Sequence, residues 1–183
     1  MEKTKVGKDK LAEILAKFTE NLSKESQYRS ITKSEKGKQV NLKKIKFEIF
    51  ILNMFIITWL CQNKKFSKDL LDLCTINMYE RVLPLLPEGI ELGFSKWGNA
   101  KIHLPRETLL AAFEQEWLND RYAVYYKAVK NLESDSGTRE IGKIIVKNLC
   151  GNMDDPIQTL KAGTSFIVSL KHISNYLDNL EID

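Results

Sequence analysis

Residues 45–61 form the most continuous apolar stretch of the chain. Thirteen of these 17 residues are apolar, and the polar ones are Lys46, Glu48, Asn53 and Thr58. On a helix with about 100° between neighbouring residues, Asn53 and Thr58 point about 140° apart, so no polar stripe runs along the segment. A helix that is apolar on every side is either buried inside a protein or spans a membrane.

Length and charge favour the buried helix. The most apolar part, 47–61, has 15 residues and would make about 22 Å of helix, against a hydrocarbon core of about 30 Å. It contains Glu48, and a charged side chain is costly in lipid. Basic residues flank both of its ends, so charge does not indicate which way it would cross a membrane. We therefore expect a buried central helix at about 39–62 and disfavour a membrane partner.

Apolar residues recur at helical spacing in several other segments, each preceded by a residue suited to a helix start. These expected starts are Asp9, Ser67, Pro105, Thr138 and Asp155. The first helix should run to about Ser26, and polar residues 119–121 should interrupt the helix that follows Pro105. On the last helix, the expected apolar face consists of Ile157, Leu160, Phe166, Ile167, Leu170, Ile173, Leu177 and Leu180.

Residues 89–104 have a different pattern. Apolar residues alternate with polar ones or glycine on both sides of a five-residue, glycine-containing segment, a pattern typical of a β-hairpin. A lone hairpin is marginally stable, so we expect it to pack on the helices. Residues 1–8 are expected to be frayed, and 27–38 to be a mobile basic loop because they have no periodicity.

Together these patterns predict an all-α fold. We expect one helical domain over residues 1–183, a bundle of five to seven helices around the central helix, with a small hairpin insert. The nine glycines and four prolines are few enough for a helical protein with short connections.

Charge adds a possible partner class. The formal net charge is +4, but residues 1–46 carry 13 basic against six acidic residues, and the remainder carries 15 against 18. Such asymmetry indicates a polyanion partner, although lysines mixed with acids also make an ordinary solvated surface. The candidate phosphate contacts are Arg29, Lys33, Lys36, Lys38, Lys43 and Lys44.

The residues that usually carry chemistry are sparse. The sequence has no glycine-rich phosphate loop, no G-x-S-x-G, no H-E-x-x-H and only two histidines, so we predict no catalytic, metal or cofactor residues and regard an enzyme as less favoured. Cys61, Cys74 and Cys150 are odd in number and far apart. Free thiols, mostly buried as small hydrophobic groups in a cytoplasmic protein, fit this usage better than a disulfide framework.

Two polar residues of the central helix are open to two interpretations. We expect Glu48 at the exposed entry of the helix, near Lys44, and Asn53 as a hydrogen-bonded group in the core. The alternative is a buried carboxylate, which would be a sign of function.

The leading function hypothesis is a non-enzymatic helical protein-interaction module, such as an adaptor, a regulatory subunit or a small subunit of a complex. The candidate protein contacts are Trp97, Arg121, Tyr122, Tyr125 and Tyr126, because aromatic residues and arginine are enriched at interfaces. The partner would be another protein or a second copy of the chain. The alternatives are nucleic-acid binding through the basic N-terminal region and an apolar small-ligand pocket between helices.

Overall fold

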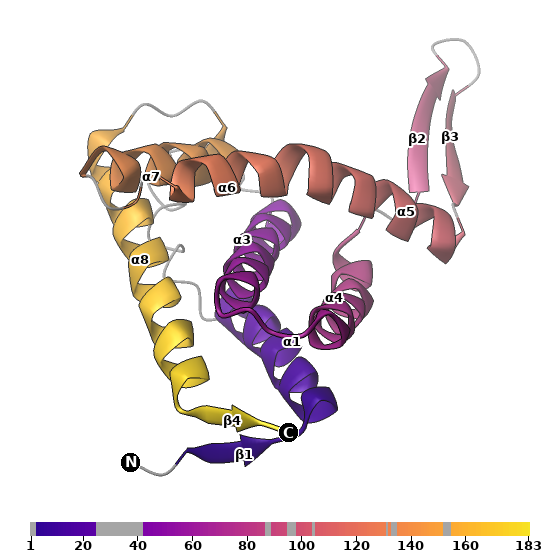
Figure 1. Cartoon of the computed structure of the whole chain (residues 1–183). Coiled ribbons are helices and arrows are strands. Elements are labelled where there is room, and N and C mark those ends of the chain that lie inside the picture. The colour runs from indigo at the N-terminus through magenta and orange to yellow at the C-terminus, as the bar shows by residue number, and fades with distance from the viewer. Residues whose placement is uncertain are drawn as a thin grey trace.

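The computed structural model shows an all-α bundle built around one buried helix, which confirms the predicted fold class (Figure 1). It describes residues 3–24, 42–86, 89–94, 98–103, 105–130, 132, 135–151 and 155–183. The predicted loop at 27–38 lies outside this part of the chain.

The chain is mostly helical, with one pair of strands in its middle and a short strand near each end. The helical elements are α1 (Lys8–Lys24), α3 (Leu42–Asn63), α4 (Lys68–Val82), the 3-10 turn η1 (Leu83–Leu85), α5 (Arg106–Glu116), the π-helix η2 (Trp117–Tyr122), α6 (Ala123–Val129), α7 (Asp135–Cys150) and α8 (Pro156–Asp178). The strands are β1 (Thr4–Val6), β2 (Gly89–Phe94), β3 (Gly98–His103) and β4 (Leu180–Ile182).

Helix α3 is the centre of the bundle, as its apolar composition predicts. Helices α1, α4, α7 and α8 and the η2 segment all pack on it, and Figure 1 shows it surrounded by them. Every residue from Glu48 to Ile57 is buried. Burial of large apolar side chains is worth about 1.5–3 kcal/mol each, so this helix supplies a major part of the driving force for folding.

The same helix passes a length and composition test for a membrane span. Ile45–Asn63 has 19 residues and a mean hydropathy of 1.5, so its length does not exclude a span as firmly as the 15-residue core suggested. Inside the protein, however, 72% of the most apolar window is buried. Neighbouring helices therefore account for its apolar surface.

Two of the predicted helix starts are confirmed by side-chain caps. The Ser67 hydroxyl accepts a hydrogen bond from the Leu70 amide at 3.4 Å. The Asp155 carboxylate accepts hydrogen bonds from the Ile157 and Gln158 amides at 2.8 and 3.2 Å. These bonds satisfy amides that the first helical turn leaves without partners.

Two other predicted caps are wrong. Helix α1 begins at Lys8, so Asp9 lies in its first turn, where an acid is favoured by the helix dipole. Helix α7 begins at Asp135, so Thr138 lies inside it. The predicted end at Gly151 is confirmed, since that glycine follows α7 with a φ of 82°, a conformation that favours glycine.

The N-terminal segment differs from the frayed end that we expected. Thr4–Val6 forms β1 and pairs in parallel with β4, with Thr4 opposite Leu180 and Val6 opposite Ile182. The Thr4 amide also donates to the Asn179 carbonyl at 3.0 Å. The segment has no helical or alternating signal of its own, and its order comes from a partner strand more than 170 residues away along the chain.

The predicted hairpin is confirmed as a pair of strands. β2 and β3 pair antiparallel, with Ile90 opposite Ile102 and Leu92 opposite Ala100. Our expectation that the hairpin packs on the helices is wrong, because Figure 1 shows it standing away from the bundle beyond α5.

The predicted interruption at 119–121 is present as a change of helix type. Residues Trp117–Tyr122 form a π-helix between α5 and α6, and the three elements run on as one long rod in Figure 1. A π-turn takes one more residue than an α-turn, so it shifts which side chains face the core. The shift lets Trp117 and Tyr122, five residues apart, meet edge to face with ring centroids 5.6 Å apart.

Helices α7 and α8 approach so closely that their backbones touch. A Cβ atom added to Gly142 would lie 2.1 Å from the Thr159 carbonyl oxygen, and one added to Gly163 would lie 2.3 Å from the Thr138 carbonyl oxygen. The inner face of α8 is accordingly built mainly from small or polar residues next to α7. Its buried residues are Gln158, Thr159, Ala162, Gly163, Phe166, Ser169, Ile173 and Leu177.

This packing overturns part of the predicted apolar face of α8. Ile157 and Leu160 are exposed, whereas Phe166, Ile173 and Leu177 are buried as expected. Near its start, α8 needs small residues against α7, so the large apolar side chains there point outward.

The contact between α7 and α8 gives a stability prediction. We expect Gly142→Ala to lower the free energy of unfolding by about 2 kcal/mol or more, because the new methyl group overlaps the α8 backbone. At an ordinary helix-interior glycine the same change would stabilise by about 0.5–1 kcal/mol. Guanidinium unfolding followed by circular dichroism measures the difference.

Gly7→Ala is the matched control. An added Cβ there meets no atom within 4 Å, and the change only replaces a favoured N-cap residue of α1, so it should cost about 1 kcal/mol or less. Equal stability of the Gly142 and Gly7 variants would contradict the close packing of α7 on α8.

Candidate functional site

Most of the predicted phosphate contacts lie outside the described residues. Arg29, Lys33, Lys36 and Lys38 fall in the segment between α1 and α3, and Trp97 falls between β2 and β3. Lys43 and Lys44 lie in the first turn of α3, where the structure describes the backbone alone. The remaining candidates, on η2 and α6, can be placed.

Arg121 joins the η2 segment to the central helix. Its guanidinium Nη2 donates to the Glu48 carboxylate at 2.8 Å, and its Nε lies 3.6 Å from the exposed Glu116 carboxylate. Glu48 is only 3% exposed. The expectation of an exposed Glu48 at the helix entry is therefore wrong, because helix α3 turns this residue toward η2 rather than toward solvent.

The three tyrosines divide between core and surface. Tyr125 is buried, its ring lies 5.3 Å from that of Phe55, and its hydroxyl accepts a hydrogen bond from the Asn148 amide at 2.9 Å. Tyr125 therefore supports the fold and offers no area to a partner. Tyr122 is half-buried beside Phe55, whereas Tyr126 is exposed and carries Lys130 over its ring at 4.6 Å.

Arg121 and Tyr126 reach solvent from η2 and α6, as does part of the half-buried Tyr122. They offer a small surface, since Arg121 is already paired with Glu48. A contact role for these two residues stays a prediction.

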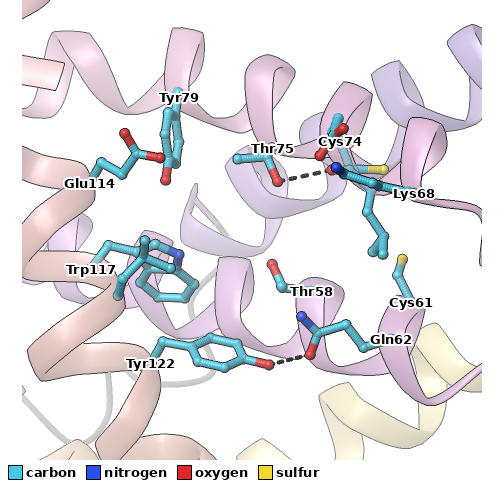
Figure 2. Close-up of a pocket in the computed structure, with 13 residues that line it drawn as sticks. Thr58, Cys61, Gln62, Lys68, Cys74, Thr75, Tyr79, Glu114, Trp117 and Tyr122 are labelled. Carbon is cyan, nitrogen blue, oxygen red and sulfur yellow. Dashed lines mark hydrogen bonds between the residues drawn. The ribbon is translucent and has the colours of Figure 1, made fainter. Parts of the chain in front are cut away.

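A cavity of about 260 Å³ lies where α3, α4, α5 and η2 meet (Figure 2). Trp117 and Tyr122 form one side, and Tyr79 with Glu114 another. The Tyr122 hydroxyl donates to the Gln62 side chain, which fixes the ring against α3. The lining combines aromatic faces with hydroxyl, amide and carboxylate groups, which is the usual chemistry of a small-molecule site.

Two cysteines line the same cavity. Cys61 on α3 and Cys74 on α4 are both buried and free. The chain positions themselves, 13 residues apart, gave no local metal-binding or redox motif. The signal that could have found the pair is their place on the apolar faces of two consecutive helices.

Burial sets the ionisation of the aromatic hydroxyls around this site. It raises the pKa of Tyr79, next to Glu114, and the pKa of Tyr125, because the phenolate form loses its hydration. The pKa of Tyr122 is raised for the same reason, with the charge of a Tyr126 phenolate as the next cause. These three phenols are therefore neutral hydrogen-bonding groups at physiological pH.

Comparison with known proteins does not assign the chain to a family. No family model, curated protein or solved structure matches it. Among the residues that the structure describes, no group of three or more histidine, cysteine, aspartate and glutamate side chains is arranged to hold a metal ion. The fold therefore defines the class, an all-α bundle with a small cavity between its helices.

The buried ion pair gives a second prediction. We expect Arg121→Ala to lower the free energy of unfolding by about 2 kcal/mol or more, because the buried Glu48 carboxylate loses its guanidinium partner. Urea unfolding monitored by tryptophan fluorescence measures the change.

Glu116→Gln is the control, since it removes an exposed charge from the same arginine and should cost about 0.5 kcal/mol or less. A double variant, Glu48→Met with Arg121→Met, should be more stable than the protein with Glu48→Met alone or Arg121→Met alone. Additive losses in the double variant would contradict the coupling.

The tyrosines give a pH prediction. Their folded-state pKa values lie above the unfolded value of about 10, so their stabilising contribution is complete below pH ~10 and is lost as the pH rises further. We expect the free energy of unfolding to fall above pH ~10 as buried phenols ionise. Denaturant unfolding across this range, with absorbance of the phenolate, follows both events.

Tyr125→Phe separates this effect from lysine titration, because it removes one buried phenol and no lysine. The alkaline loss of stability should become shallower in the variant. An identical pH dependence in both proteins would show that Tyr125 ionises equally in the folded and unfolded states.

Proposed function

We propose that the protein is a non-enzymatic helical interaction module that binds another protein through the outer face of α8. The observation that carries this proposal is the inverted polarity of the helix. Its small residues face α7, while Ile157, Leu160 and Val168 are 65, 57 and 52% exposed.

These three residues form one stripe along the helix. Their spacings of three and eight residues keep them on one side of an α-helix, and exposed Thr164 lies between Leu160 and Val168. Large apolar side chains gathered on one exposed helix face are typical of an interaction surface. The interior does not need them, because the contact with α7 is made by other residues.

Charge indicates the chemistry of the partner. Lys161 and Lys171 are exposed on α8, and the helix contains no acidic residue before Asp178. A partner helix with an apolar stripe bordered by aspartate and glutamate would match both features.

The alternatives keep more limited support. The cavity beside Trp117 favours a small ligand, which would be held between aromatic faces and the Glu114 carboxylate. Nucleic-acid binding rests on the basic N-terminal region, whose candidate side chains the structure does not describe. A cytoplasmic location is part of the same proposal and rests on the free thiols.

Leu160→Glu tests the α8 surface. The change removes apolar area and adds a negative charge, so it should weaken a complex with an apolar, acidic partner about tenfold or more. The measurement is size-exclusion chromatography with light scattering on protein purified from its native source at low salt, recorded at 260 and 280 nm.

Ile76→Glu on α4 is the matched control, because Ile76 is 59% exposed and lies on another helix. Thermal unfolding checks that both variants are folded. Loss of the partner from the Leu160 variant alone supports the proposal. Equal loss or equal retention in both variants, or absorbance at 260 nm that disappears at high salt, would contradict it.

A further inference from the structure

The cavity shown in Figure 2 has two different ends. Trp117 and Tyr122 lie at one end, with Tyr79 and Glu114 on the other side of the same end. Lys68 lies at the opposite end, near the cysteines. Lys68 begins α4 and Tyr79 lies about three turns later, which is about 16 Å further along the helix axis. The aromatic end is therefore set apart from the lysine.

Trp117 and Tyr122 form a corner of aromatic rings. Their ring centroids are 5.6 Å apart and their planes are inclined at 68°, and both residues line the cavity. The π-turn brings them to the same side of the helix, and π-turns occur frequently at functional sites. Two aromatic faces at a steep angle can contact one cation from two sides, because each ring carries negative charge density on its face.

The charge of the lining favours a cation. The lining residues that are charged at neutral pH are Glu114, Asp72 and Lys68, so carboxylates outnumber ammonium groups. Glu114 is exposed, and in the part of the chain that the structure describes no lysine or arginine lies within ion-pair distance of it. Its negative charge is therefore available at the aromatic end of the cavity.

The size and the apolar part of the lining define the ligand further. The volume of about 260 Å³ lies just below the usual range of about 300–1,000 Å³ for small-molecule sites, so a ligand of few atoms fits. Leu71 and Leu118 add apolar wall to the cavity, which suits methyl groups. A methylated ammonium ion matches all of these features, since it is positive, has an apolar surface and needs few hydrogen-bond acceptors.

We propose that this cavity binds a small methylated ammonium ion at its aromatic end. The ring faces of Trp117 and Tyr122 contact the methyl groups and attract the charge, and the Glu114 carboxylate adds a negative charge next to it. The site is built from α3, α4, α5 and η2, so it is independent of the stripe on α8.

The test titrates the full chain with choline chloride at constant ionic strength and follows the protein by two-dimensional NMR. Neohexyl alcohol is the control ligand, because it has the shape of choline with carbon in place of the ammonium nitrogen. Choline should give saturable shifts and bind at least about tenfold more tightly than the alcohol. Nuclear Overhauser effects should connect the choline methyl protons to the rings of Trp117 and Tyr122.

Glu114→Gln and Glu116→Gln form a matched pair of variants. Each removes one exposed carboxylate from α5, but Glu116 does not line this cavity. Glu114→Gln should weaken choline binding about tenfold and leave the affinity for neohexyl alcohol unchanged, whereas Glu116→Gln should change neither affinity by more than about twofold. The NMR spectra of the variants also check that both are folded.

The absence of saturable shifts with choline would overturn the proposal, as would equally tight binding of neohexyl alcohol. Equal affinities of the two variants for choline would overturn it too, and so would Overhauser contacts to residues outside the cavity. The Overhauser contacts are measured in the natural chain, so they test the proposal even where a substitution unfolds the protein.

Discussion

The rest of the structure depends on the burial of one helix that is apolar on every side. From Glu48 to Ile57 every residue of helix α3 is buried, so other elements have to cover this part on all sides, and α1, α4, α7, α8 and η2 do so. The polar groups inside it then have to be satisfied by these neighbours. Arg121 pairs with Glu48 at 2.8 Å, and the Asn53 amide donates to the Thr19 carbonyl at 3.4 Å. Each bond connects the central helix to a particular covering element and so restricts how that element can slide or turn.

The π-helix is best understood through the same constraint. A continuous α-helix from Arg106 to Val129 would not place Trp117, Arg121 and Tyr122 together against α3, because a five-residue step turns too far around an α-helix. The extra residue of the π-turn brings them to one side. The resulting contacts of Tyr122 with Trp117 and Phe55 close one wall of the cavity. Covering α3 and shaping the cavity are therefore done by the same local distortion.

The sequence predicted where helices and strands occur better than it predicted what each side chain packs against. Periodicity shows which residues share a helix face, and for α3 this was sufficient because all its faces are apolar. For α8 it was insufficient, since Gly163 and Gly142 decide which face meets α7, and a glycine leaves no hydrophobic signal. The exposed Ile157 and Leu160 were misplaced for this reason. The buried Glu48 was misplaced because its partner, Arg121, lies 73 residues further along the chain on η2. Strand β1 was missed because its partner β4 lies at the other end of the described chain.

The candidate sites result from how the helices pack against one another. The stripe on α8 exists because close packing on α7 displaces large apolar side chains to the outside. Cys61 and Cys74 line the same cavity because α4 covers α3 directly after a short turn, which places the buried faces of both helices together whatever residues they carry. Cysteine is well suited to such a position as a small hydrophobic group, so burial alone would explain either thiol.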